Sequence, residues 1–173
     1  MTGWLLLLGV IAVGMSIVLS GCAKRPPRAF DLVYEDINPR SETHGRILAL
    51  SELYAEQGIV LQFTASWCKF CREQMPLLQE FYAQGETPMV FVAADEGPYR
   101  ENILTIAERA GLTAPLLFVP ADEAETVGKH YPYEVIPATY FIDAEGRIHG
   151  SHQGELSAER LGREFEETLG NER

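Results

Sequence analysis

Two cysteines separated by two residues, Cys68 and Cys71, are the residues of this sequence whose types and spacing best suit chemistry. They stand where an apolar run, Ile59–Ala65, meets a stretch with helical periodicity. A thiol at a helix N-terminus is favoured as the thiolate, because unpaired backbone N–H groups and the helix dipole stabilise negative charge. Cys68 is therefore the expected nucleophile. Cys71 can attack a mixed disulfide formed at Cys68 and release the partner, so the spacing predicts thiol-disulfide exchange.

Other uses of the same pair stay open. Two cysteines and two histidines can hold zinc, with His149 and His152 as the histidine ligands, although these stand closer together than usual. A copper-binding or metallochaperone module would use the thiolates with His130 or His149, because thiolates suit Cu(I). A thiol peroxidase would use Cys68 against peroxide, but a vicinal pair better suits disulfide exchange. We expect no metal and no cofactor other than the redox-active Cys68–Cys71 disulfide.

The elements that must position the pair alternate between strand-like and helix-like patterns. This alternation predicts an α/β fold with a central sheet. Short apolar runs give the strands, and apolar residues three or four apart give the helices. In chain order we expect a strand pair at Ala29–Tyr34 and Arg46–Leu50, a buried strand at Ile59–Thr64, a helix near Cys68–Ala83, a strand at Pro88–Ala94, a helix near Tyr99–Ala110, a strand at Leu116–Val119, a short helix at Ala124–Tyr131, a hairpin of Thr139–Asp143 and Arg147–Ser151, and a helix near Ser157–Leu169.

The N-terminal residues differ in kind from the rest of the chain. Trp4–Leu19 is an uncharged, mostly aliphatic stretch, and no charged side chain precedes Lys24. Its 16 residues are short for a spanning helix, which needs about 20, and slightly long for a signal-peptide core. The tetrapeptide Leu19-Ser20-Gly21-Cys22 resembles the lipobox of bacterial lipoproteins, in which the cysteine is acylated and becomes the mature N-terminus.

These features predict a leader, a tether and one domain. We expect a lipoprotein signal peptide at residues 1–21, a lipidated tether at 22–28 that is held to the membrane through Cys22, and a domain at 29–173. An uncleaved anchor is the alternative, because Met1-Thr2-Gly3 lacks the basic residue of a signal peptide. The positive-inside rule would then place the domain in the cytoplasm.

Composition limits the partners. With 173 residues, the chain is long enough for one good core but too short for two ordinary domains plus a leader. A net charge of -11 and the lack of any run of lysine or arginine argue against nucleic acid or an anionic membrane surface as a partner.

The three cysteines divide into one acylated residue and one redox pair, which leaves no odd thiol for an oxidising compartment.

Two separated motifs together resemble the thioredoxin fold. The first is Trp67-Cys68-Lys69-Phe70-Cys71 between a strand and a helix, and the second is Val135-Ile136-Pro137-Ala138-Thr139 before a hairpin and a terminal helix. More narrowly, Phe63-Thr64-Ala65-Ser66-Trp67-Cys68 with Cys71-Arg72-Glu73-Gln74-Met75-Pro76 resembles the membrane-anchored TlpA/ResA-type thiol-disulfide oxidoreductases. The resemblance implies a thioredoxin fold, with a central mixed sheet flanked by helices and an N-terminal strand-pair extension.

The resemblance also implies roles around the dithiol. Pro137 matches the cis-proline that faces the cysteine pair and lets the backbone at Ile136 pair with an extended substrate segment. Trp67, Lys69 and Phe70 then form the shell of the active site. The alternatives are an ordinary trans proline that opens a strand and a tryptophan that fills the core.

The residues expected to take up the proton of Cys71 differ from the family pattern. Gln62 stands six residues before the first cysteine, where thioredoxins carry a buried aspartate, and Gln74 stands where the TlpA/ResA group often has a glutamate. A neutral amide cannot act as a base, and Glu73, one position earlier, is turned by about 100° around the helix. Asp95 and Glu96 follow a predicted strand and are candidates for proton transfer, although solvated loop carboxylates are the simpler expectation.

By the same resemblance, the chain is an extracytoplasmic oxidoreductase anchored in the bacterial cell envelope, with its domain on the periplasmic or extracytoplasmic side. It would reduce disulfides of exported proteins, for example in cytochrome c maturation, with electrons from a membrane donor of the DsbD/CcdA type. A disulfide-forming oxidant stays open as the alternative, because Lys69 and Arg72 would stabilise the Cys68 thiolate. About 30 mV corresponds to roughly 1.4 kcal/mol, so a few side chains can reverse the direction.

Overall fold

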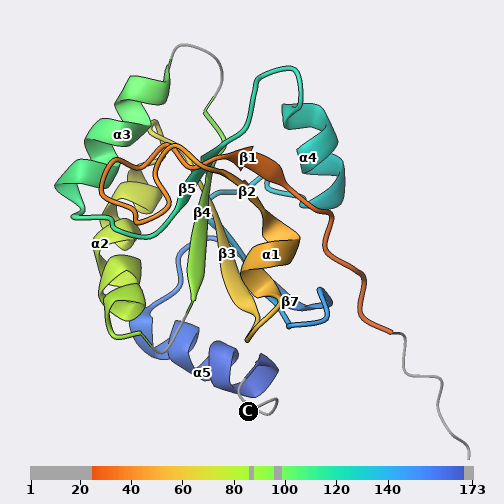
Figure 1. Cartoon of the computed structure of the whole chain (residues 1–173). Coiled ribbons are helices and arrows are strands. Elements are labelled where there is room, and N and C mark those ends of the chain that lie inside the picture. Colours follow the sequence, from red (N-terminus) through yellow and green to blue (C-terminus); the bar gives the residue numbers. More distant parts are fainter. Residues whose placement is uncertain (1–24, 86–87, 96–98, 170–173) are drawn as a thin grey trace, which may run out of the picture.

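The computed structural model describes residues 25–85, 88–95 and 99–169 (Figure 1). The predicted signal peptide, Cys22 and Glu96 lie outside these residues, as do residues 170–173. Every helix within the described ranges is too short or too polar to span a bilayer.

A five-stranded mixed sheet forms the centre of the domain, in the order β5-β4-β3-β6-β7. Its strands are β3 (Ile59–Thr64), β4 (Met89–Ala93), β5 (Leu116–Phe118), β6 (Ala138–Ile142) and β7 (Ile148–Gln153). The first three are parallel, while β6 and β7 run antiparallel to their neighbours. Every residue of β3, β4 and β6 is buried, and this burial on both faces explains their nearly continuous apolar sequences.

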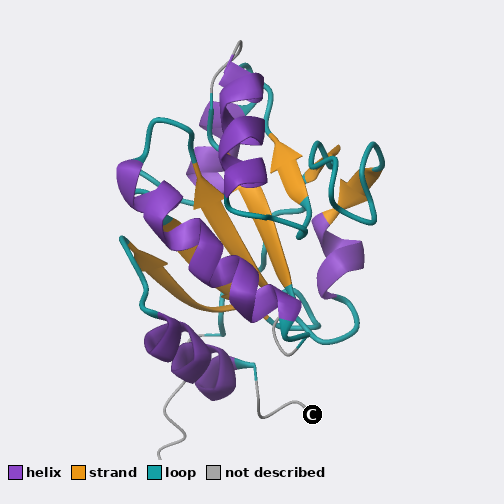
Figure 2. Cartoon of the chain, turned by 90° about the vertical axis from the view of Figure 1, so that its left-hand side faces the viewer, coloured by secondary structure: helices purple, strands orange, loops and turns teal. Residues whose placement is uncertain are grey.

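Helices cover both faces of the sheet. On one face lie α2 (Lys69–Ala83), α3 (Arg100–Arg109) and α5 (Ala158–Thr168), as Figure 2 shows. On the other lie α1 (Leu50–Tyr54) and α4 (Ala124–His130). Side chains alternate between the two cores, so Met89 and Phe91 face α2 and α3 while Val90 and Val92 face α1 and α4. The predicted mixed sheet flanked by helices is confirmed.

An antiparallel strand pair, β1 (Val33–Glu35) and β2 (Ile47–Ala49), precedes the sheet, as expected. Both strands are shorter than predicted. Leu50, expected to end the second strand, instead begins α1 with its side chain buried. No sequence pattern indicated α1, because its five residues are too few to establish a helical period. The other predicted elements agree within two residues at their ends.

The dithiol and the β6–β7 turn lie at opposite ends of the sheet. Antiparallel pairing sets Phe63 against Ala138 and Ile59 against Ile142. The C-terminal end of β3 therefore leads to the cysteines, and the C-terminal end of β6 leads to the turn. A strand of six residues separates these ends by about 20 Å at roughly 3.3 Å per residue.

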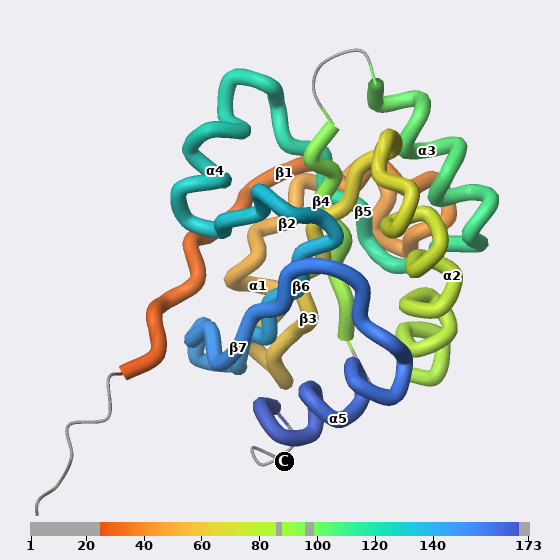
Figure 3. The backbone as a smooth tube through the Cα atoms, turned by 180° about the vertical axis from the view of Figure 1, so that it is seen from behind, coloured from red at the N-terminus to blue at the C-terminus, as the bar shows by residue number. Residues whose placement is uncertain are grey.

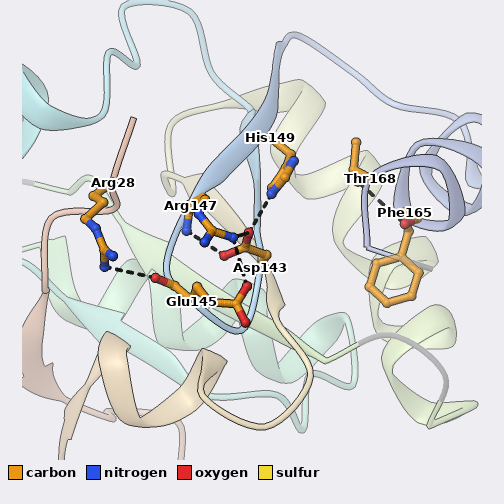
Figure 4. Close-up of polar contacts among 7 residues, drawn as sticks. All are labelled: Arg28, Asp143, Glu145, Arg147, His149, Phe165 and Thr168. Atoms are coloured by element: carbon orange, nitrogen blue, oxygen red, sulfur yellow. Dashed lines mark hydrogen bonds and ion pairs between the residues drawn. The ribbon is translucent and has the colours of Figure 1, made fainter. Parts of the chain in front are cut away.

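The chain enters the domain at the turn end. Pro27 and Arg28, the last residues of the predicted tether, run beside the β6–β7 turn (Figure 3). The backbone N–H of Ile148 donates to the Pro27 carbonyl at 2.8 Å. The Arg28 guanidinium donates to the Glu145 carbonyl at 3.1 Å (Figure 4). Pro27 and Arg28 therefore lie at the end of the sheet away from the dithiol.

Candidate active site

The two cysteines form a disulfide at the N-terminus of α2, with their Cα atoms 5.3 Å apart. Cys68 is the N-cap of the helix, and its Sγ accepts a hydrogen bond from the Cys71 N–H at 3.0 Å. Both side chains are buried. After reduction, the same N–H and the positive end of the helix dipole would favour the Cys68 thiolate. The helix terminus thus supplies the electrostatic setting that the sequence predicted.

The Ile136–Pro137 peptide bond is cis, which excludes the alternative of an ordinary trans proline. The Ile136 carbonyl oxygen lies 3.6 Å from Cys68 Sγ. The half-buried Ile136 side chain packs against both cysteines and Ala65. The cysteine segment and the Ile136–Pro137 segment, about seventy residues apart in the chain, therefore meet at the sulfur atoms. A backbone carbonyl acceptor lies beside Cys68, the residue expected to exchange.

Exposed apolar side chains surround the buried disulfide. Trp67 is 67% exposed, Phe70 50% and Val135 52%. Trp67 therefore does not fill the core, and the alternative that it does is wrong. Clustered exposed apolar groups mark contact surfaces for partners. Sequence reasoning missed Val135, although its place directly before Ile136 in the second motif was a signal.

Lys69 lies on the outer side of the same helix turn. Its ammonium group is 3.6 Å from the Glu73 carboxylate and 5.9 Å from the centre of the Phe70 ring. Both members of the ion pair are largely exposed. Glu73 thus points along the helix surface rather than into the core, as its position around the helix predicted.

Buried amides, Gln62 and Gln74, occupy the two positions at which the resemblance implied acids. Gln62 donates to the Phe63 carbonyl at 3.1 Å and accepts from the Thr139 hydroxyl at 2.8 Å. Gln74 donates to the Leu156 carbonyl at 3.0 Å, but its Oε1 has no hydrogen-bond partner in the described structure. Both side chains are neutral, so neither can take a proton from Cys71.

Asp95 holds the loop that carries the cysteines. It accepts the Ser66 backbone N–H at 2.9 and 3.1 Å, and also accepts the Ser66 hydroxyl. Burial raises the pKa of Asp95, and the Ser66 hydrogen bonds oppose that rise only in part. The expectation of a solvated loop carboxylate is wrong for Asp95, which is only 2% exposed.

The reason for this burial lies in the strand register. Thr64 pairs with Ala93 in the parallel β3–β4 ladder. Ser66 and Asp95 each stand two residues beyond this pair, so both leave the sheet at the same level. Equal offsets from two adjacent strand ends are a sequence signal that could have identified the contact.

The histidines that were candidate metal ligands make other contacts. His149 is hydrogen-bonded to the buried Asp143 (Figure 4), His152 contacts the Glu155 carbonyl, and His130 stacks on Phe30 with ring centres 4.0 Å apart. Across the described residues, no three or more His, Cys, Asp or Glu side chains are grouped closely enough to hold a metal ion.

Comparison with known proteins agrees with this site. Residues 29–151 match the AhpC/TSA family. The chain is 30% identical over 127 residues to the thiol-disulfide oxidoreductase ResA of Geobacillus thermodenitrificans (strain NG80-2), which covers 73% of this chain and 71% of that protein.

Solved structures share the fold. The thioredoxin domain of a thiol-disulfide oxidoreductase from Bacteroides vulgatus matches with a TM-score of 0.67 and 19% identity, over 84% of this chain and 97% of that one. The pneumococcal exposed lipoprotein thioredoxin Etrx1 from Streptococcus pneumoniae strain TIGR4 matches with a TM-score of 0.63 and 20% identity, over 80% and 99%. The chain therefore belongs to the AhpC/TSA family, and it is a thiol-disulfide oxidoreductase of the ResA/TlpA kind with the Cys68–Cys71 pair.

Proposed function

We propose that the protein is a membrane-anchored, extracytoplasmic reductase that passes electrons from Cys68 and Cys71 to disulfides of exported proteins. The observation that carries this proposal is the setting of Cys68. Its sulfur accepts a helix N-terminal N–H, lies beside the Ile136 carbonyl, and is surrounded by exposed apolar side chains. This arrangement suits a thiolate that exchanges with a protein substrate.

The reaction proceeds in two exchanges. The Cys68 thiolate attacks one sulfur of the substrate disulfide, which forms a mixed disulfide and releases the other substrate sulfur as a thiolate. Cys71 then loses its proton and attacks Cys68 Sγ, which releases the second substrate thiol and leaves the Cys68–Cys71 disulfide. Two electrons pass to the substrate, and a membrane dithiol donor of the DsbD/CcdA type restores the reduced pair.

The cis-proline loop orients the substrate in this scheme. An extended substrate segment pairs with the backbone at Ile136, while Pro137 contributes no N–H of its own. Trp67, Phe70 and Val135 supply apolar contact area around the reacting sulfur. Neither Gln62 nor Gln74 can accept the Cys71 proton, so that proton leaves through another group.

The proposed anchor is a lipid on Cys22. The likeness to an exposed lipoprotein thioredoxin supports it, as does the attachment of Pro27 and Arg28 at the end of the sheet away from the dithiol. An anchor there leaves the dithiol free to meet partners. Mass spectrometry of the N-terminal peptide from membrane-extracted protein should find Cys22 as an acylated N-terminus, whereas an intact peptide that still carries residues 1–21 would favour the uncleaved anchor instead.

The redox midpoint of the Cys68/Cys71 pair tests the direction of transfer. The full chain, solubilised in detergent, is equilibrated with graded dithiol buffers, and alkylated thiols are counted by mass on the peptide that contains both cysteines. A midpoint near or below about -250 mV is expected for a reductase, whereas one near -120 mV would make the protein an oxidant. If no reversible disulfide forms, thiol exchange is excluded and Cu(I) binding becomes the function to test.

A further inference from the structure

A groove lies between α2 and α3, near the end of the sheet that carries the dithiol. Its larger part, about 600 Å³, includes Trp67, Arg72, Tyr99, Asn102 and Arg109 among its lining residues. A second cavity of about 200 Å³ shares Arg72, Ile106 and Arg109 with the first and extends to Pro76. We call the two together the α2–α3 groove. The cysteines do not line the groove, but Trp67 at its end directly precedes Cys68 in the chain.

One face of α3 is turned toward this groove. Tyr99, Asn102, Ile106 and Arg109 recur at intervals of three or four residues, which places them on one side of the helix. The core of the domain uses another side of the helix, with Ile103 and Ala107 fully buried. On the groove face, Ile106 is half-buried and also packs against this core, whereas Tyr99, Asn102 and Arg109 are exposed and free to contact a ligand.

The charge of the groove is opposite to that of the protein. The chain has a net charge of -11, yet the charged side chains that line the described part of the groove are arginines. Arg72 donates to the Ser66 carbonyl at 2.9 Å through Nη1, and this single bond uses one of its five N–H donors.

Several arginines form no ion pair within the described residues, Arg40, Arg46 and Arg163 among them, but Arg72 and Arg109 are the ones that line the groove. Arg100, Arg147 and Arg160 each form an ion pair with a carboxylate. Arg72 and Arg109 form none with the residues that the structure describes. Two arginines without an acidic partner, in a strongly acidic protein, make a site suited to a carboxylate, which arginine binds through two parallel hydrogen bonds.

We infer that the α2–α3 groove binds acidic side chains of the polypeptide substrate, close in sequence to the cysteine that exchanges with Cys68. The inference rests on the proposed exchange with protein substrates. A polypeptide is the favoured occupant because its neighbouring residues must pass Trp67 when its sulfur lies at Cys68. Arg72 and Arg109 then select substrates whose cysteine is flanked by Asp or Glu.

Peptide reduction tests this selectivity. Two disulfide peptides are compared that differ only in the residues flanking one cysteine, which are glutamates in one and glutamines in the other. With the full chain at low salt, kcat/KM should be about fivefold higher for the glutamate peptide, and the ratio should fall toward one in Arg109→Gln and at high salt. Arg163→Gln, an exposed position on α5 outside the groove, loses the same charge and should keep the wild-type ratio.

A binding measurement separates this inference from the proposed function. Peptides with serine in place of cysteine are titrated against the full chain, and the change in tryptophan fluorescence that Trp67 reports from the groove is the signal. Tighter binding of the glutamate peptide that is lost in Arg109→Gln supports acid binding in the groove. This holds even if neither disulfide peptide is reduced, because absence of reduction would overturn only the proposed reductase function. The groove is overturned as the binding site for acidic side chains if the wild-type protein reduces and binds the glutamate and glutamine peptides equally well. It is also overturned if Arg109→Gln and Arg163→Gln lose the preference for the glutamate peptide to the same extent.

Discussion

Two buried aspartates stand at opposite ends of the sheet, and their surroundings differ. Asp95 follows β4 at the dithiol end and, among the described residues, accepts hydrogen bonds from the neutral groups of Ser66 alone. Asp143 follows β6 at the turn end, where it accepts from the Arg147 guanidinium and backbone and from the His149 ring. Both carboxylates are at most 2% exposed.

The pKa values of the two carboxylates are shifted in opposite directions. Burial raises the pKa of Asp95, and no cation is among the causes that offset this rise. Burial alone would also raise the pKa of Asp143, but the hydrogen bonds from Arg147 and His149 and the charge of His149 lower it below its usual value. At the turn end, the buried carboxylate is therefore stabilised by ion pairs with Arg147 and His149. The dithiol end combines an uncompensated acid with neutral amides, exposed aromatic rings and a reactive sulfur pair.

The largest effect is expected at the dithiol itself. Cys68→Ser should reduce turnover to the rate of uncatalysed exchange, because the activated sulfur is lost. Cys71→Ser keeps the nucleophile but cannot resolve the mixed disulfide, so a covalent complex with the substrate should accumulate. Non-reducing gels and mass spectrometry distinguish the two. Accumulation in Cys68→Ser rather than in Cys71→Ser would reverse the assigned roles.

At the turn end, stability rather than redox chemistry should change. Asp143→Ala leaves the Arg147 and His149 donors without their acceptor and should cost about 2 to 3 kcal/mol of unfolding free energy. Glu145→Gln is the matched control, because it removes an exposed carboxylate from the same Arg147 guanidinium, 3.0 Å away. It should cost at most about 1 kcal/mol. Urea unfolding measures both, and the redox midpoint of Asp143→Ala should equal that of the wild type.

The pH dependence of stability should separate the two aspartates. The lowered pKa of Asp143 gives stability that is present above about pH 4 and is lost as the pH falls through the folded-state pKa. The raised pKa of Asp95 acts in the opposite sense, since its contribution is full below about pH 4 and is lost as the pH rises through the folded-state pKa. Asp143→Asn should therefore flatten the acid limb of the stability profile, and Asp95→Asn should remove the decline above pH 4. Identical profiles for the two variants would contradict the comparison.

Asp95 also has a structural role that an amide can fill. Asp95→Ala leaves the Ser66 N–H and hydroxyl without an acceptor and should cost about 1 to 3 kcal/mol of unfolding free energy. Asp95→Asn retains an acceptor oxygen without the buried charge, so it should be at least as stable as the wild type at pH 7. Thermal unfolding of the pair measures the difference. Equal losses in both variants would show that the charge, rather than the hydrogen bonds, holds the loop.

The smallest expected effect concerns the buried amides. Gln74→Glu places a carboxylate one helical turn after Cys71, where its negative charge would disfavour a thiolate and make the pair more reducing. The midpoint should become more negative by an amount on the order of tens of mV. Glu73→Gln is the control, because its carboxylate is exposed and paired with Lys69, and its midpoint should move less. A larger shift in Glu73→Gln would show that surface charge governs the potential.

Local sequence predicted those features that depend on neighbouring residues. The α2 helix begins at the residue after Cys68, as the strand-to-helix junction indicated, and Ser157 caps α5 at its predicted start. The resemblance to the TlpA/ResA group supplied the thioredoxin fold and the cis bond before Pro137. The chain could not reveal α1, since a helix of five residues lies below the length at which periodicity is visible.

The sequence by itself determined the dithiol, its place at a helix N-terminus and the α/β order of elements, because propensity, periodicity and motif spacing act over short stretches of chain. Tertiary structure decided the desolvation of Asp95 beneath Ser66, for which the strand ends gave only an indirect signal, and it alone decided the meeting of Arg72 and Arg109 in one groove and the attachment of Pro27 at the end away from the cysteines. Each of these depends on strand register and on which helix faces meet. Long-range packing fixes both, and it also sets the desolvation that shifts the pKa of a buried carboxylate.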